Sequence, residues 1–180
     1  MTMRLLLILM LFSPGLPSAA QAPGGCIKPV FKHYCLGGNL SQLLRQRPAD
    51  SQPVSNGERR GVIYTEGRER VYVMAYQGRI YKVLHTYEPA NQMTFKDLQH
   101  RLREKYGRSQ DQSSFPDRVR HMAGKIGAIR RGEGVLKYVW QLPGEAWRVE
   151  LSWMRKLGVS VSYLANELDA RQREARLEGL

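Results

Sequence analysis

Cysteine is nearly absent from the 180-residue chain, which contains two, Cys26 and Cys35, in the stretch GGCIKPVFKHYCLGG. A zinc site needs three or four ligands in good geometry, and His33 is the one histidine within this stretch. The other histidines are scattered along the sequence, at His85, His100 and His121. The Cys-x-x-Cys spacing of a redox-active pair is also missing. These absences predict that the chain holds no metal here.

Recognisable catalytic motifs are also lacking. The chain has no G-x-x-x-x-G-K-[ST] phosphate loop, no H-E-x-x-H and no G-x-S-x-G. Ser160 and Ser162 occupy the outward positions of a predicted strand, where a solvent-facing role is favoured over a nucleophile. Three carboxylates are isolated in sequence, at Glu88, Glu133 and Glu145. We therefore expect a non-enzymatic protein without cofactors, and a hydrolase with dispersed residues remains an alternative.

Long apolar runs are confined to the start of the chain. Arg4 precedes the apolar run Leu5 to Phe12, and small residues follow up to Ala20. This order is typical of a secretory signal peptide over residues 1–20, because the run is shorter than the roughly 20 residues that cross a bilayer. We expect a periplasmic or secreted protein with no transmembrane segment after cleavage. Residues 21–180 would then form a single α+β domain.

Export bears on the two cysteines. In an oxidising compartment, two nearby cysteines normally pair. A Cys26–Cys35 disulfide would close a loop of about ten residues and stabilise the fold by roughly 2.5–3 kcal/mol in the chain-entropy model. His33 is then most simply a loop residue.

Acidic residues are outnumbered, with 16 Asp and Glu against 28 Lys and Arg, which gives a formal net charge of +12. Such an excess favours anionic partners, such as lipopolysaccharide, acidic lipid or an acidic protein surface, although it also keeps an exported domain soluble. The densest group of cations is a candidate binding site for anionic ligands and comprises Arg118, Arg120, Lys125, Arg130 and Arg131. The alternative interpretation is that these side chains are simply solvated. Nucleic acid is not an expected partner, because Trp140, Trp147 and Trp153 lie at the spacing of strand cores.

Hydrophobic periodicity predicts the elements of the first half. Asn39 can cap a short helix that carries Leu40, Leu43 and Leu44. Residues 45–60 are polar and contain two prolines, so we expect a flexible loop there. Strands follow over 62–64, 71–76 and 80–87, separated by glycine turns. A helix then runs from Thr94, its predicted cap, to Gly107.

The second half repeats this order. Residues 117–122 predict a short helical turn, and a second strand set begins near Ile126. Its strands cover 135–142, 147–153 and 159–163, and their alternation predicts that one sheet face meets water. A closing helix over 165–177 is supported by the pairs Glu167–Arg171 and Asp169–Arg173. The fold class is therefore α+β, with two helix-βββ units and a C-terminal helix packed on antiparallel sheet.

Four features of the sequence resemble known families. They are the predicted signal peptide, the small cysteine loop, the helix end Glu104-Lys105-Tyr106-Gly107 and the doubled order of one helix followed by three strands. The chain resembles small uncharacterised Gram-negative periplasmic proteins. It is also similar in layout to β-lactamase-inhibitory proteins and to the outer-membrane assembly lipoprotein domain. The lipid-attachment cysteine of the lipoprotein is missing, and the inhibitors have a longer first helix and more cysteines. The resemblance implies binding through a sheet face, and it carries no functional residue over.

These observations predict an exported protein that binds another envelope or secreted protein. The alternative is a binder of lipopolysaccharide or acidic lipid through its basic surface.

Overall fold

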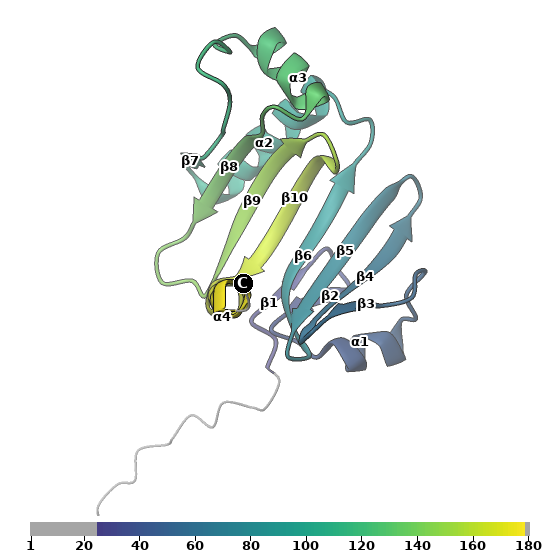
Figure 1. Cartoon of the computed structure of the whole chain (residues 1–180). Helices are drawn as coiled ribbons and strands as arrows, with labels where there is room; N and C mark the ends of the chain where they lie inside the picture. The colour runs from purple at the N-terminus through teal and green to yellow at the C-terminus, as the bar shows by residue number, and fades with distance from the viewer. Residues whose placement is uncertain (1–24, 179–180) are drawn as a thin grey trace, which may run out of the picture.

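The computed structural model describes residues 25–178, which build one large antiparallel sheet (Figure 1). Its eight strands lie in the order β3-β4-β5-β6-β10-β9-β8-β7. They are β3 (Val54–Asn56), β4 (Arg59–Glu66), β5 (Glu69–Tyr76), β6 (Arg79–Tyr87), β7 (Gln110–Asp111), β8 (Leu136–Gln141), β9 (Trp147–Met154) and β10 (Gly158–Ala165). The predicted signal peptide lies outside the described residues.

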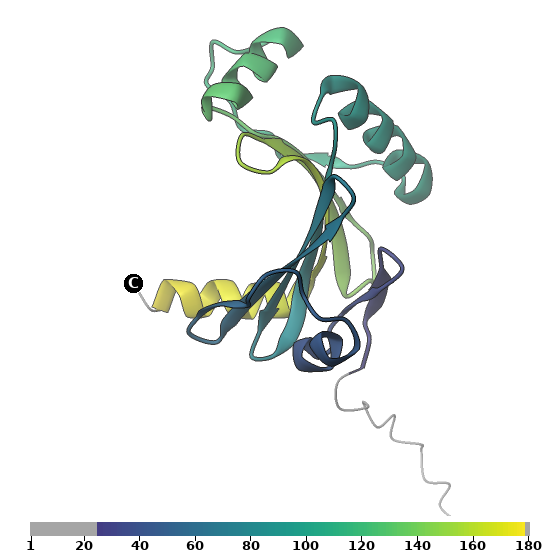
Figure 2. The same cartoon turned by 90° about the vertical axis from the view of Figure 1, so that its right-hand side faces the viewer.

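A hairpin and four helices flank the sheet within residues 25–178. The hairpin pairs β1 (Lys28–Val30) with β2 (Tyr34–Leu36). The helices are α1 (Leu40–Gln46), α2 (Gln92–Tyr106), α3 (Met122–Arg131) and α4 (Asn166–Glu178). Figure 2 shows the hairpin, α1 and α2 on one side of the sheet and α4 on the other, toward which the sheet curves. The predicted α+β class is confirmed.

The two faces of the sheet follow from strand alternation. On the core face, beneath the hairpin and α2, Val73 pairs with Val83, and Tyr163 lies between Val83 and Val149. The three valines are fully buried. On the opposite face, Leu164 of β10 lies between Lys82 of β6 and Arg148 of β9. We call this second side, on which α4 lies, the concave face.

The predicted order of helix, three strands, helix, three strands, helix is confirmed by α1, β4–β6, α2, β8–β10 and α4. Asn39 caps α1, since its side chain accepts a hydrogen bond from the Gln42 N–H at 3.0 Å. Gly107 ends α2 with a φ of 78°, a conformation that glycine adopts without strain. The predicted cap Thr94 is wrong, because Asn91 holds that place and accepts from the Thr94 N–H at 3.0 Å.

Two further predictions need correction. The strand set does not begin near Ile126, because this residue lies in the helix α3. The helical turn predicted over residues 117–122 overlaps α3 only at Met122. Two glycines within α3 weaken the helical pattern that would reveal it. Residues 45–60 contain the end of α1, the edge strand β3 and the start of β4, so this stretch is more regular than a polar loop.

The predicted Cys26–Cys35 disulfide is confirmed. It ties Cys26, two residues before the start of β1, to Cys35 in the middle of β2, so it closes the base of the hairpin. At the hairpin tip, Phe31 adopts a φ of 46°. Its ring packs edge-on against His85 and Tyr163, with centroids 5.1 and 5.2 Å away. The hairpin is therefore fixed at both ends, and it covers the junction of β6 and β10.

Replacing both cysteines by serine should lower the free energy of unfolding by about 2.5–3 kcal/mol, because the open chain regains the loop entropy that the disulfide removes. Urea titration followed by tryptophan fluorescence measures this. Equal midpoints for the variant and the wild type would show that packing at Phe31 alone holds the hairpin.

Candidate functional site

Three neighbouring hollows lie on the concave face, and we call this row of hollows the groove. The central hollow has a volume of about 430 Å³ and is centred on Lys82, so we call it the Lys82 hollow. It shares Gln172 and Arg176 of α4 with a hollow of about 470 Å³ beside the β3–β4 turn. It shares Leu157 with a hollow of about 410 Å³ at the β9–β10 turn. The groove therefore follows α4 and continues over the sheet.

A chain of ion pairs forms one wall of the Lys82 hollow. Arg148 of β9 lies at its centre and contacts Glu150 at 3.0 Å and Asp169 of α4. Lys137 continues the chain on one side, 3.1 Å from Glu150, and Arg173 continues it on the other, 2.8 Å from Asp169. Both carboxylates are buried, and each contacts two cations. The chain thereby joins α4 to the middle of the sheet.

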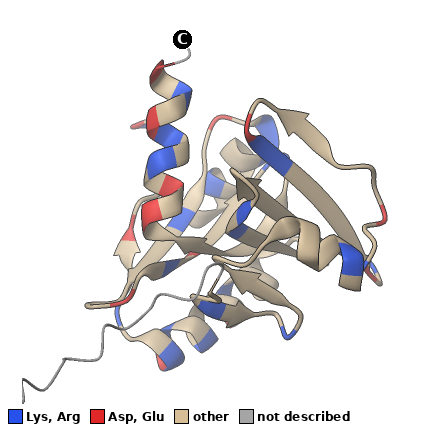
Figure 3. Ribbon diagram, turned by 90° about the horizontal axis from the view of Figure 1, so that it is seen from below, with Lys and Arg blue, Asp and Glu red and all other residues tan. Residues whose placement is uncertain are grey.

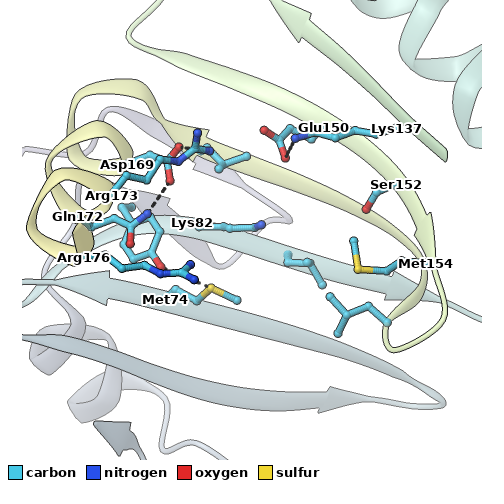
Figure 4. A pocket seen from close by; sticks show the side chains of 14 residues that line it. Met74, Lys82, Lys137, Glu150, Ser152, Met154, Asp169, Gln172, Arg173 and Arg176 are labelled. Carbon is cyan, nitrogen blue, oxygen red and sulfur yellow. Dashed lines mark hydrogen bonds and ion pairs between the residues drawn. The ribbon is translucent and has the colours of Figure 1, made fainter. Parts of the chain in front are cut away.

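Lys82 differs from these neighbours because its ammonium has no ion pair or hydrogen bond within residues 25–178. Figure 4 shows it extending into the hollow between the polar side chains of α4 and Met154. Burial lowers the pKa of Lys82, and Glu150 and Asp169 oppose this only in part. Burial would raise the pKa of Glu150, but Lys137, Lys82 and Arg148 lower it below its usual range. The wall is therefore ionised, and the lysine is a partly desolvated cation without a partner.

The floor of the hollow mixes hydroxyls with apolar side chains. The Ser152 and Ser160 hydroxyls lie 3.0 Å apart and bond to each other. Both serines are buried, as is Ser162. The prediction that this strand face meets water is therefore wrong at these positions. Alternation places these serines on the polar face of the sheet, but it does not show how far neighbouring side chains cover that face.

The hollow at the β9–β10 turn is more strongly basic. Arg68, Arg70, Arg155 and Lys156 line it, together with Tyr72, Thr86 and Glu88. None of the four cations has an ion pair with a residue of the described range 25–178. Figure 3 shows further Lys and Arg on α4 and on the strands beside it. The groove therefore presents uncompensated positive charge along its length.

The cations singled out from the sequence lie elsewhere, in the loop before α3 and on α3 itself. Arg118 and Arg131 both contact Glu133, at 3.7 and 2.9 Å. Hydrogen bonding to Arg131 lowers the pKa of Glu133. Lys125 lies over the Phe115 ring, 5.3 Å from its centroid. The structure therefore does not gather the five into one hollow, and Arg120 and Arg130 are simply exposed.

The groove residues leave only a faint signal in the sequence. Lys82 interrupts the apolar run of a central strand, and Glu150 interrupts the run Trp147 to Trp153. A charge at such a position needs a partner or a function. Asp169 was predicted to pair with Arg173, which is confirmed, but its second partner Arg148 belongs to a distant strand.

The chemistry that this arrangement supports is binding. Residues 25–178 contain no group of three His, Cys, Asp or Glu side chains placed to hold a metal ion. No helix in the same range combines the length and hydropathy needed to cross a bilayer. What the groove offers is a row of cations beside half-buried apolar side chains, which suits an anionic occupant.

No protein-family model and no curated protein matches the chain. Among solved structures, it is similar to a cysteine-rich secretory protein of Staphylococcus aureus, with a TM-score of 0.40 and 9% sequence identity. The likeness covers 72% of this chain and 44% of that one. It carries no argument about fold or function, and the resemblance to β-lactamase-inhibitory proteins stays a prediction.

Replacing Lys82 by Met should leave the protein at least as stable as the wild type at pH 7. The substitution keeps most of the side-chain volume and removes a charge that burial disfavours. Thermal unfolding followed by circular dichroism checks this. A clear loss of stability would mean that Lys82 serves the fold through Glu150 and Asp169.

Replacing Arg148 by Met should cost about 3 kcal/mol, because two buried carboxylates each lose a cation. The control is Arg171→Met. It removes an exposed ion pair with Glu167 within α4 and should cost about 0.5 kcal/mol or less. Urea titration compares the two, and equal losses would contradict a central role for Arg148.

The free energies of unfolding of the Arg148→Met and Arg171→Met variants should also respond differently to a fall in pH. The lowered pKa of Glu150 contributes stability that is present above about pH 4.3, its ordinary value, and is lost as pH falls through the folded-state pKa. Without Arg148 the folded-state pKa of Glu150 lies closer to its ordinary value, so the loss of stability on acidification should be smaller and should end at a higher pH. Urea titrations between pH 3 and 7 compare the two variants.

Proposed function

We propose that this protein is an exported, non-enzymatic binding protein that receives an acidic segment of another envelope or secreted protein on its concave face. The observation that carries the proposal is the row of neighbouring hollows, in which Lys82, Arg70 and Arg155 lack ion pairs within the described residues. Charge complementarity of this kind steers a partner and fixes its orientation.

The shape of the groove supports an extended occupant. Three hollows of similar volume follow one another and share lining residues, so a ligand that fills one leaves its neighbours open. A polypeptide segment can place successive side chains into successive hollows. Carboxylates on that segment would meet the cations that have no partner in the free protein.

Export is supported by the disulfide and by the predicted signal peptide. Disulfides persist in oxidising compartments and are rare in the cytosol, and the described chain has no free cysteine. Periplasm and extracellular space meet this condition equally.

A second candidate is an anionic envelope lipid, because the four cations at the β9–β10 turn form the most basic part of the groove. Arg155 also reaches α3, where its guanidinium donates to the Arg131 carbonyl at 3.3 Å. Through this contact the basic surface continues toward Arg130 and Arg131.

A charge-matched pair of variants tests the proposal. Arg70→Glu with Arg155→Glu changes the concave face, and Lys96→Glu with Arg103→Glu changes α2 by the same net charge on the opposite side of the sheet. The three tagged proteins are exported and used as bait in envelope extract. We expect a protein retained by the wild type and the α2 variant and lost from the concave variant, since rim charges set encounter and specificity.

Binding of the purified partner should then weaken at least about tenfold in the concave variant and fall with added salt. Retention of no protein, or equal retention by both variants, would overturn the proposal. Flotation with phosphatidylglycerol vesicles forms a second arm. Vesicle binding that depends on the concave face, without a protein partner, would favour the lipid candidate.

A further inference from the structure

The Lys82 hollow combines a half-buried lysine, which has no ion pair within the described residues, with an apolar side. Its ammonium lies between α4 and the end of β9, and the half-buried side chains of Met74, Met154 and Leu157 line the same space (Figure 4). Leu84 and Leu164 are buried beneath them. An occupant of this hollow therefore meets positive charge and apolar surface at once.

We propose that the Lys82 hollow recognises a carboxylate side chain that neighbours a bulky apolar side chain in the bound segment. The carboxylate contacts the Lys82 ammonium, and the apolar side chain packs on Met154 and Leu157. This inference rests on the proposed function and names the partner chemistry at its central position.

The other charges of the hollow favour a single carboxylate over a phosphate. Lys137 already contacts Glu150, and Arg173 contacts Asp169, so each has a carboxylate partner. Lys82 is the one half-buried cation lining the hollow that has no carboxylate partner within the described residues, and it supplies one charge and up to three donors. A phosphate carries more charge and more acceptors than one lysine satisfies.

The wall would repel an incoming carboxylate if its own acids were not neutralised. Arg148 lies between Glu150 and Asp169, and Lys137 and Arg173 complete their coordination. The nearest charges around Lys82 from β8, β9 and α4 are therefore balanced or positive, with Arg176 of α4 also at the rim. The Tyr81 hydroxyl is directed to the Met74 sulfur, at 3.7 Å.

Methionine suits the apolar part of this site. Its unbranched, polarizable side chain adapts to different apolar partners, and two methionines from different strands line the hollow. Removing Lys82 would leave this surface in place, so the charge and the apolar contact can be tested separately.

The experiment is an NMR titration of the full exported protein with ¹³C-methyl methionine, using blocked ten-residue peptides at up to millimolar concentration. One peptide contains Glu-Leu in a flexible acidic context, a second contains Gln-Leu and a third Glu-Ser. We expect Met74 and Met154 to shift with the Glu-Leu peptide and Met93, which is 80% exposed on α2, to stay unchanged. Loss of either side chain should weaken binding about tenfold.

Variants assign the contact. Lys82→Met should bind the Glu-Leu and Gln-Leu peptides equally, and Lys82→Arg should retain the preference for Glu. The matched control Lys96→Met, on α2, should behave as the wild type. Because burial lowers the pKa of Lys82, wild-type affinity for the Glu-Leu peptide should fall as the pH is raised, whereas that of Lys82→Arg should not.

Two outcomes separate this inference from the proposed function. If Met74 and Met154 do not shift, or Lys82→Met keeps the preference for Glu, the inference is overturned even where the Arg70 and Arg155 variant loses its envelope partner. If that partner is never captured but the Glu-Leu peptide binds at Lys82, the inference stands as a local specificity and the proposed function fails.

Discussion

The contact of Arg148 with Glu150 and Asp169 determines how α4 packs on the concave face and which charges that face presents. Glu150 belongs to a strand and Asp169 to the helix that follows the last strand, and both are buried. Burying two carboxylates is unfavourable unless cations accompany them, so α4 can lie on this side only with Arg148 between them. With α4 in place, Lys82 is screened from solvent and the groove gains its wall. The position of one guanidinium therefore links the packing of a helix to the electrostatics of the face beside it.

The fold follows from the sequence further than the site does. Alternation in 147–153 and 159–163 identifies β9 and β10 because each strand has one uniformly apolar side, and the Phe95 to Tyr106 stripe identifies α2. Local capping is less certain, since Asn91 and Thr94 are both good caps three residues apart. The helix α3 escapes prediction because Gly124 and Gly127 weaken its pattern. The burial of α3 depends on tertiary contacts, which intrinsic helix propensity does not include.

The groove could not be predicted because its members come from separate elements. Lys82 and Glu150 each interrupt an apolar run, but nothing in either segment shows which residues they meet, and the strand order brings them together. The basic residues that are dense in the sequence, from Arg118 to Arg131, are partly neutralised by Glu133, whereas Arg70 and Arg155 are dispersed in sequence and gather in space. Charge density along a chain is therefore a poor guide to charge density on its surface here.

The strand order also constrains how the chain reaches this state. The last strand, β10, is an interior strand and pairs with β6, so Val83 meets Tyr163, a residue 80 positions later in the chain. The two halves can each form a meander early, but the sheet stays in two pieces until the C-terminal residues have arrived. Such distant pairing slows folding, and the N-terminal hairpin, which packs across the same junction, can dock only afterwards. The seam between β6 and β10 therefore stays open until residue 165 has been synthesised, however early each meander forms.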